Sequence, residues 1–293
     1  MTRPTYHLSA AEAAEPPYDV MVTPERAGWT YAGLAVLDLE AGQSVEVETG
    51  ESELLVLSLT GGCTVTGDGG TLTVFGRETV FSGPSDFVYV PRDASVQVSS
   101  RDGGRFAMPS ARCARRLPMR HQPASEVPVE LRGAGQASRQ VNNFCTPDAF
   151  ETDKLIACEV LTPGGNWSSY PPHKHDEQTA QESQLEEIYY YEVTPGPVGP
   201  GMAYQRVYGH DRADIDVLAE VRSGDVVLIP HGWHGPSMAA PGYDLYYLNV
   251  MAGPGQVRSW NITDDPAHGW VRSSWDGVDV DPRLPFAAAG GTR

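Results

Sequence analysis

"RSGDVVLIPHGWHGPSM", residues 222–238, runs from a glycine through a hydrophobic strand-like segment to a proline, a tight turn and a second strand-like segment. An earlier stretch, "SGPSDFVYVPRDASVQV" at residues 82–98, has the same order of features. A motif that recurs at a large spacing is typical of a duplicated structural unit. The sequence therefore predicts two copies of one β module.

Short runs with period-two alternation fill the chain on both sides of a break. Residues 15–115 contain "ELLVLSLTGG", and residues 140–265 contain "EEIYYYEV" and "YDLYYLNVMAG". Such runs, punctuated by Gly, Pro and Asp, predict antiparallel strands. Between the two blocks, residues 116–140 are rich in Pro, Arg and Gly and have little periodicity. We therefore expect an all-β protein with one sandwich or barrel in residues 1–125 and another in residues 126–293.

Composition limits the partners and the compartment. The chain has 21 Lys and Arg against 38 Asp and Glu, a formal net charge of −17, which argues against nucleic acid or an anionic membrane surface as a partner. No run approaches the roughly 18 apolar residues of a membrane span, and the first residues do not resemble a signal peptide. Four scattered cysteines without a CxxC motif indicate free thiols, so we expect a cytoplasmic protein.

The stretch "PPHKHD" contains His173 and His175 one residue apart. Residues i and i+2 of a strand share a face, so both imidazoles could bind one ion inside a barrel. Further ligands could come from two pairs of later residues, which are Glu186 or Glu187, and His231 or His234. Three imidazoles and one carboxylate leave open positions on a divalent ion, as catalytic sites require. The simpler alternative is a polar strand end at the surface.

"GGNWSSYPPHKHD", then Glu187, then "GDVVLIPHGWH" resemble the two motifs of the cupins. This chain departs from the usual cupin motifs in two places. A polar insertion, "DEQTAQESQLE", separates His175 from the glutamate, and the second motif has one residue fewer between its glycine and its histidine. The resemblance implies a bicupin, with two jelly-roll-like barrels that each form a double-stranded β-helix. In the first barrel Ala94 and Val96 stand where a ligand histidine would be. We therefore expect that barrel to hold no metal and to serve packing or assembly.

More specifically, the chain resembles the 5-deoxy-glucuronate isomerase family of myo-inositol catabolism. The stretches that carry this resemblance are "LRGAGQASRQVNNF", "PPHKHD", "LEEIYYY", "QRVYG" and "APGYDLYYLNVMAGP". The related uronate isomerases of pectin breakdown share the His-x-His, the Glu before an aromatic strand and the late His. Carried over onto this chain, the resemblance implies four ligands of a divalent metal ion, zinc first with Mn, Fe or Ni as alternatives: His173, His175, Glu187 and His234.

The resemblance implies that 5-deoxy-D-glucuronate, a small anionic sugar acid, is converted to 5-dehydro-2-deoxy-D-gluconate. Such an aldose–ketose interconversion needs a group that moves a proton between neighbouring carbons. The candidates for this catalytic work are Glu187, Tyr189, Tyr191 and Lys174, with Tyr204 as a further possibility. The substrate carboxylate needs a cation, and the hydroxyls need polar partners. The candidate substrate-binding residues are Arg139, Arg206, Gln205, Tyr204 and Gln140.

Two other classes of protein would suit the same residues. Three histidines and a glutamate also suit an Fe(II) dioxygenase, and a non-catalytic sugar-binding barrel would need no chemistry at all. Because double-cupin proteins commonly self-associate, we expect a homo-oligomer. Four other histidines are expected to lie at the surface, in loops or near the terminus: His7, His121, His210 and His268.

Overall fold

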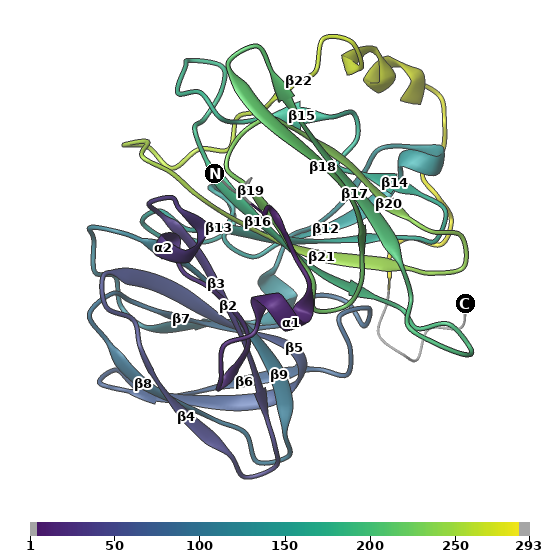
Figure 1. Ribbon diagram of the computed structural model, residues 1–293. Coiled ribbons are helices and arrows are strands. Elements are labelled where there is room, and N and C mark those ends of the chain that lie inside the picture. Colours follow the sequence, from purple (N-terminus) through teal and green to yellow (C-terminus); the bar gives the residue numbers. More distant parts are fainter. Residues whose placement is uncertain (1–4, 287–293) are drawn as a thin grey trace.

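The computed structural model describes residues 5–286, and these fold into the predicted all-β architecture of two barrels (Figure 1). The first barrel is one nine-stranded sheet. Its strands are β2 (Tyr18–Val22), β3 (Ala32–Leu39), β4 (Ser44–Glu48), β5 (Ser52–Gly67), β6 (Gly70–Arg77), β7 (Phe87–Val90), β8 (Ser95–Ser99), β9 (Gly104–Arg112) and β10 (Arg120–Gln122).

The second barrel is built from two sheets. The seven-stranded sheet has the order β1 (His7–Leu8), β19 (Val226–Ile229), β16 (Glu186–Val193), β21 (Leu245–Ala252), β13 (Ile156–Thr162), β12 (Arg139–Asn143) and β11 (Val129–Arg132). The six-stranded sheet contains β18 (Ala213–Val221), β17 (Ala203–His210), β20 (Trp233–Ala239), β15 (His173–Lys174), β22 (Thr263–Asp264) and β14 (Trp167–Ser168).

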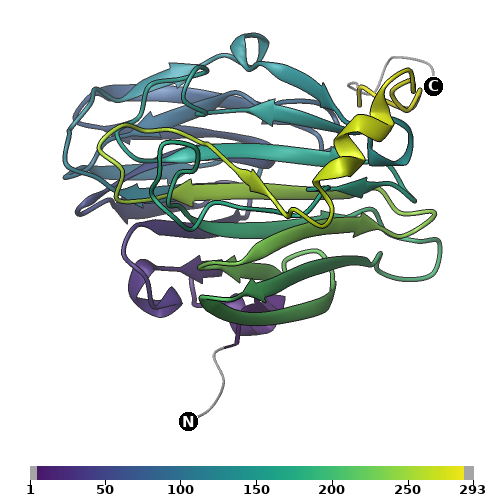
Figure 2. The same ribbon diagram turned by 90° about the horizontal axis from the view of Figure 1, so that it is seen from above.

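Helices are short, as the weak helical signal predicts. They are α1 (Ala10–Ala13), α2 (Pro24–Ala27) and the 3₁₀ segments η1 (Ala124–Glu126), η2 (Gly135–Ala137) and η3 (Gly269–Trp275). No helix among residues 5–286 has the length and apolar content that crossing a membrane requires. Figure 2 shows the sheets stacked as layers, with the yellow C-terminal segment along their side.

The predicted boundary between residues 125 and 126 falls inside η1, between the last strand of the nine-stranded sheet and β11. One short strand does not follow this division, because β1 pairs with β19 of the second barrel. Residues 1–4 and 287–293, the outer ends of the two predicted domains, lie outside the described residues. The division of the chain into two domains therefore stays a prediction.

The strands differ in burial according to what covers their two faces. Along β18 the apolar residues alternate with exposed ones, so one face packs inward and the other meets water. All of β21 and most of β16 are buried on both faces. Their outer faces share one apolar core with the first barrel, in which Tyr190 and Leu248 belong to the same cluster as Phe87. These two strands form the junction between the barrels.

Each barrel also binds the other through one glutamate. Glu53 on β5 is buried and accepts hydrogen bonds from the backbone N–H groups of residues 153–155, at 2.7–3.0 Å. Glu186 on β16 accepts hydrogen bonds from the backbone N–H groups of residues 30–32, at 2.7–2.9 Å. Both groups of donors come just before or at the start of a strand of the other barrel. Charge-assisted bonds of this kind are about twice as strong as neutral ones.

A buried ion pair adds a third connection. Arg77 of the first barrel donates two hydrogen bonds of 2.7 Å to the carboxylate of Glu159 on β13. The same carboxylate accepts from Asn142 Nδ2 at 2.7 Å, and Arg77 also donates to backbone carbonyls such as that of Gly83. A buried charge pair with all its hydrogen bonds made is stable, but removal of one partner leaves the other charge uncompensated.

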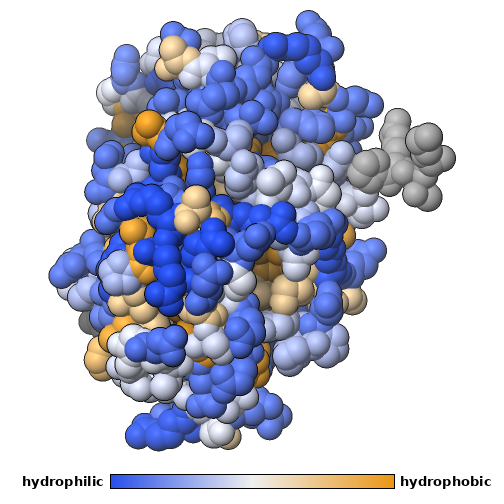
Figure 3. Space-filling view, turned by 90° about the vertical axis from the view of Figure 1, so that its left-hand side faces the viewer, coloured by the Kyte–Doolittle hydropathy of each residue, from blue (hydrophilic) through white to orange (hydrophobic). Residues whose placement is uncertain are grey.

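The face shown in Figure 3 is mostly hydrophilic, and its hydrophobic residues lie in small separate groups. Large exposed apolar side chains are spread over different elements, for example Phe75 on β6, Leu218 on β18 and Trp270 on η3. Scattered residues of this kind are normal on a protein surface. They do not identify an assembly face, and the homo-oligomer stays a prediction.

Substitution E159Q should lower the free energy of unfolding by about 3–5 kcal/mol, because it leaves the Arg77 guanidinium buried without its counter-charge. Urea unfolding followed by tryptophan fluorescence measures this change. The double variant R77M/E159L should recover most of the loss. The control is D102N, which removes an exposed ion pair with Arg101 and should leave the unfolding midpoint unchanged. Equal stability of E159Q and the unaltered protein would contradict this account of the junction.

Candidate metal and substrate site

Four side chains from three strand regions meet inside the second barrel. His173 of β15 lies directly opposite His234 of β20, and His175 follows β15. The ligand atoms of the three imidazoles all lie within 4.8 Å of one another. Glu187 Oε2 lies 3.1 Å from His175 Nε2 and 3.1 Å from His234 Nε2. The structure thus brings together the four residues that the resemblance proposes as metal ligands.

The backbone fixes which nitrogen of each imidazole faces this cluster. Each Nδ1 lies near a backbone carbonyl oxygen, in the pairs His173–Pro171 at 3.4 Å, His175–Leu185 at 3.2 Å and His234–Gly232 at 3.1 Å. An Nδ1–H that donates to a carbonyl leaves Nε2 as the lone-pair nitrogen. All three Nε2 atoms are therefore available as ligands.

The electrostatics of the cluster favour an ionised Glu187 beside a neutral His173. Burial lowers the pKa of His173 well below its usual range, and the neighbouring His234 and His175 lower it further. Burial alone would raise the pKa of Glu187, but the charge of His234 and the hydrogen bond from His175 outweigh burial and lower that pKa to about 2. Burial alone would lower the pKa of His175, but its hydrogen bond to the Glu187 carboxylate outweighs burial and raises that pKa. Metal ligands must be deprotonated, which suits His173 and Glu187, and binding of a cation at His175 would displace any proton that this imidazole shares with Glu187.

One buried atom tests the fit of a cation directly. The Nε2 of His234 has no hydrogen-bond partner among the described residues, although Glu187 Oε2 lies 3.1 Å away. A buried nitrogen without a partner costs free energy, and a divalent cation between these groups would satisfy its lone pair. The residues present therefore fit a divalent metal ion.

The first barrel has the same strand pairing but different residues at the ligand positions. Glu187 pairs with Ile229 and Met251, and the equivalent pairing in the first barrel joins Leu54 to Val90 and Ser110. Likewise, the His173–His234 pair corresponds to Val47 opposite Val96 on β4 and β8. The first barrel therefore carries apolar side chains where three of the four ligands stand. The only histidine, cysteine or carboxylate cluster of metal-binding geometry in residues 5–286 is that of the second barrel.

A cavity of about 510 Å³ lies beside the cluster, and His173, Ser169 and Asn249 are among its lining residues. Arg139 also lines it and is buried, but its only hydrogen bond within the described chain goes to the carbonyl oxygen of Ala137, at 3.1 Å. Burial lowers the pKa of Arg139 to about 10. At neutral pH the cavity thus contains a guanidinium that no described carboxylate pairs with.

Two other arginines in the wall of the cavity are neutralised. Arg132 Nε pairs with Glu130 Oε1 at 2.8 Å, and Arg272 pairs with the Asp264 carboxylate at 2.5 Å. The guanidinium carbons of Arg139 and Arg272 both lie over the Trp275 ring, at 5.8 and 5.7 Å from its centroid. The cavity therefore has one uncompensated positive charge, which suits a ligand with one carboxylate.

Two of the predicted tyrosines lie inside the barrel. The Tyr189 ring stacks on Tyr247, and its hydroxyl lies 2.7 Å from Ser169 Oγ, which lines the cavity. The Tyr191 hydroxyl donates to Gln205 Oε1 at 3.1 Å, so Gln205 also points inward. Burial raises the pKa of both tyrosines well above its usual range. At neutral pH both phenols are therefore protonated.

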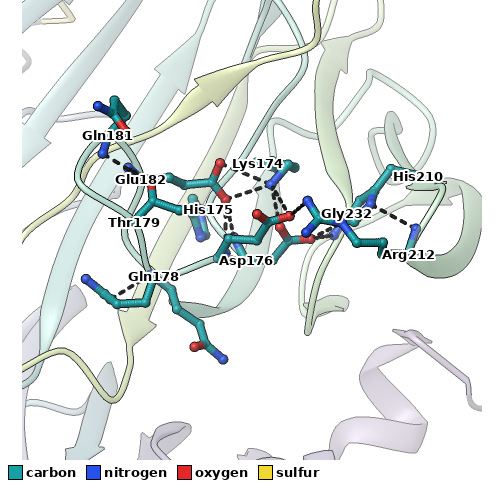
Figure 4. A network of polar contacts seen from close by, with 12 residues as sticks. Lys174, His175, Asp176, Gln178, Thr179, Gln181, Glu182, His210, Arg212 and Gly232 are labelled. Carbon is teal, nitrogen blue, oxygen red and sulfur yellow. Dashed lines mark hydrogen bonds and ion pairs between the residues drawn. The ribbon is translucent and has the colours of Figure 1, made fainter.

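Three predicted site residues lie on the wrong face of their strands. Tyr204 and Arg206 alternate with the inward Gln205 and point outward, where Arg206 pairs with Asp216 at 2.5 Å. Lys174 alternates with His173 and His175, and Figure 4 shows its Nζ held by carboxylates instead of facing the imidazoles. Neighbouring residues of a strand point to opposite faces, which explains why each of these side chains points away from the site. The prediction that they line the site is therefore wrong.

The alternatives left open for single residues also separate by face. Glu186 points to the first barrel, so Glu187 is the inward carboxylate. His231 is partly exposed, with its Nε2 3.3 Å from the Asp214 carbonyl oxygen. Gln140 is buried but accepts a hydrogen bond from the backbone N–H of Phe286, outside the set of cavity residues.

Several residues of the site were missed at the level of sequence. Asn249 donates from Nδ2 to Glu187 Oε1 at 2.7 Å and fixes the orientation of that carboxylate. Arg132, Arg272 and Trp275 form the wall around Arg139. Asn249 follows Tyr247 at the spacing of one strand face, which could have indicated an inward polar residue. Nothing in the sequence near Arg272 or Trp275 places them there.

Solved structures with a similar fold indicate the structural class of this chain. Oxalate decarboxylase from Bacillus subtilis aligns over 90% of this chain and 80% of its own, with a TM-score of 0.61 and 12% identity, which supports the two-barrel cupin fold alone. An IolB-like protein from Salmonella typhimurium aligns over 92% of this chain and 99% of its own, with a TM-score of 0.84 and 34% identity. The fold and the cluster thus define a double-barrel cupin.

The particular family follows from the sequence comparison. Residues 6–271 match the KduI/IolB family, and the chain belongs to it. A relative from Geobacillus kaustophilus is 44% identical over 263 residues, which cover 87% of this chain and 91% of the relative. A relative from Bacillus subtilis is 39% identical over 253 residues, which cover 85% and 91%. Both are named 5-deoxy-glucuronate isomerase.

Substitutions at the neighbouring residues Glu186 and Glu187 should separate metal binding from barrel packing. E187Q should bind zinc much more weakly, because it removes the carboxylate that lies 3.1 Å from His175 and from His234. E186Q should lower the thermal unfolding midpoint and keep zinc binding, because its side chain contacts only the first barrel. Isothermal titration and calorimetric melting measure the two effects. Loss of zinc binding in E186Q, or full zinc affinity in E187Q, would contradict the assignment.

Proposed function

We propose that this protein is a 5-deoxy-glucuronate isomerase, which converts 5-deoxy-D-glucuronate to 5-dehydro-2-deoxy-D-gluconate in myo-inositol degradation. Curated relatives that are 38–44% identical over most of the chain have this name. The observation in the structure that carries the proposal is the uncompensated Arg139 in a cavity that also exposes His173. A sugar acid has one carboxylate, which Arg139 could bind, and its aldehyde end has oxygens that could lie at the histidine cluster.

In this proposal Arg139 binds the substrate carboxylate. A guanidinium binds a carboxylate through two parallel hydrogen bonds, which fixes orientation as well as distance. The neighbouring Arg132 and Arg272 already have carboxylate partners, so the cavity would not favour a dianion such as a phosphate ester. With the carboxylate held at Arg139, the aldehyde end of the substrate points to the histidine cluster.

We further propose that His173, His175, Glu187 and His234 hold a divalent metal ion, of which zinc is the first candidate and Mn, Fe or Ni are alternatives. When bound, such an ion polarises a carbonyl and makes the neighbouring C–H more acidic. Asn249 keeps Glu187 Oε1 occupied, so that only Oε2 of this carboxylate faces the imidazoles. The three backbone carbonyls behind the imidazoles keep their Nε2 atoms directed at the same point.

Isomerisation through an enediol would require a proton donor for the substrate carbonyl oxygen at the cavity. Tyr189 and Ser169 are the best placed of the residues considered, because Ser169 lines the cavity and the Tyr189 hydroxyl lies 2.7 Å behind it. A phenol with a raised pKa is a proton donor at neutral pH, so this pair would hold a proton for the substrate oxygen. Tyr191 lies one step further away, beside Gln205, and would support that arrangement.

The relatives do not favour the alternative of an Fe(II) dioxygenase or of a non-catalytic sugar-binding barrel. We propose a cytoplasmic enzyme, in keeping with four buried cysteines that are all free. We also propose a homo-oligomer that binds neither nucleic acid nor membranes, since the net charge of −17 opposes both contacts.

Proton NMR of 5-deoxy-D-glucuronate with the metal-loaded protein in D₂O tests the reaction. We expect loss of the aldehyde or hemiacetal signal and growth of the ketose signal. Deuterium at the new hydroxymethyl carbon would indicate proton transfer through an enediol, and its absence would indicate a hydride shift or a shielded base. If the substrate stays unchanged while metal is bound, the proposed substrate is wrong.

Substitution R139M should lower kcat/KM by at least about 30-fold, because truncating one side of a buried charge pair costs at least about 2 kcal/mol. The main effect should be on KM, since the carboxylate is remote from the reacting carbons. R206M is the matched control: this arginine points outward and should leave both constants unchanged. Steady-state kinetics of both variants decide the assignment, and an equal loss in the two variants would contradict it.

A further inference from the structure

Behind the histidine cluster, on the outer side of β15, lies a network of charged residues (Figure 4). Lys174 Nζ donates to Asp176 Oδ1 at 2.8 Å and to Glu182 Oε1 at 2.8 Å. These three side chains are nearly buried, with 8%, 7% and 5% of their area exposed. Buried charges with this many mutual contacts are rigid, and the chemistry proposed above does not use them.

Asp176 is the residue that joins this network to other strands. Its Oδ1 accepts from Lys174, while its Oδ2 accepts from His210 Nε2 at 2.8 Å and from the backbone N–H of Gly232 at 2.8 Å. His210 ends β17, and Gly232 belongs to the turn between β19 and β20. One carboxylate therefore connects the segment after β15 to two other strands of the barrel.

The contact with Gly232 reaches the metal-facing imidazole of His234. The same glycine whose N–H binds Asp176 offers its carbonyl oxygen to His234 Nδ1, at 3.1 Å. Its φ of +92° and a space that would put a Cβ 2.7 Å from the Tyr208 carbonyl oxygen restrict this position to glycine. Movement of this turn would rotate the carbonyl group that orients His234.

A second route leads to His175. Glu182 accepts from the backbone N–H groups of Asp176 and Glu177, at 2.9 and 3.0 Å, which closes the first part of the insertion, residues 176–182, into a loop. Leu185, near the end of that insertion, offers its carbonyl oxygen to His175 Nδ1. The network thus supports the backbone groups that orient two of the three imidazoles.

We propose that Asp176 is a positioning residue for the metal ligands His175 and His234. Its Oδ2 holds the Gly232 turn that orients His234. Its Oδ1 holds Lys174, which in turn holds the Glu182 carboxylate that closes the insertion before the His175 partner Leu185. This inference rests on the proposed metal site. A carboxylate is needed at this position because three donors, from Lys174, His210 and Gly232, share its two oxygens. An asparagine would offer one acceptor oxygen and would turn an N–H₂ group toward a donor. The loss should therefore appear in metal binding while the barrel stays folded.

Titration of the metal-free protein with Co²⁺, followed by visible absorption, tests this proposal. For D176N we expect Co²⁺ affinity to fall by about 10- to 100-fold, the usual effect of losing an outer partner of a metal ligand, with altered absorption bands. The matched control is E177Q. Glu177 contacts Lys174 and Arg212 but not the turn, so this variant should keep the affinity and the bands of the unaltered protein. Thermal melting of the metal-free variants reports whether each is folded.

Two results would overturn the positioning role of Asp176 and leave the proposed function intact: unaltered affinity and bands in D176N, or an equal loss in E177Q. If the unaltered protein itself does not bind Co²⁺ or Zn²⁺, both the metal site and this inference are wrong. If D176N does not fold, D176E takes its place. It keeps the charge but moves the oxygens by one methylene, so weaker binding is still expected, and unaltered binding overturns the proposal.

Discussion

The alternation of side chains at Glu186 and Glu187 sets both the contact between the barrels and the cluster inside the second barrel. Consecutive residues of a strand point to opposite faces, so β16 directs one carboxylate to the first barrel and the next into the second. Glu186 binds three backbone N–H groups at the start of β3, and Glu187 lies between His175 and His234. A register slip of one residue would turn Glu186 into the second barrel and Glu187 toward the first. Both the contact between the barrels and the contact with the histidines would then be lost.

The two barrels keep the same assembly contact and differ in their interiors. Glu53 accepts hydrogen bonds from the backbone N–H groups of residues 153–155, and Glu186 does the same for residues 30–32. In both cases a glutamate of one barrel satisfies N–H groups that come just before or at the start of a strand of the other barrel. On the next residue the barrels diverge, since Leu54 stands in place of Glu187. This agrees with the interpretation that the first barrel packs and the second holds the chemistry, and apolar side chains at the ligand positions are its physical basis.

The all-β class, the repeat of one module and the residue types of the proposed metal site could be predicted from sequence patterns. Period-two runs and the repeated Gly–strand–Pro motif need no knowledge of packing, because they follow from backbone geometry. The His-x-His spacing determined that His173 and His175 share a face and that Lys174 does not. The same alternation along a strand directs Lys174 away from the imidazoles. The prediction of Lys174 as the base was therefore contrary to the strand geometry that the sequence itself implies.

Packing between distant segments determines which of the remaining polar residues face the cavity. All five residues of β12 are buried, so no polarity pattern shows that Arg139 lies in the cavity while Gln140 lies outside it. Along β17 the outward residues include tyrosines, which suit either face, and this concealed the outward direction of Arg206. Arg272 and Trp275 reach the site from η3, far along the chain, because the C-terminal segment packs beside β15. Contacts between distant segments are set by packing, which local sequence patterns do not contain.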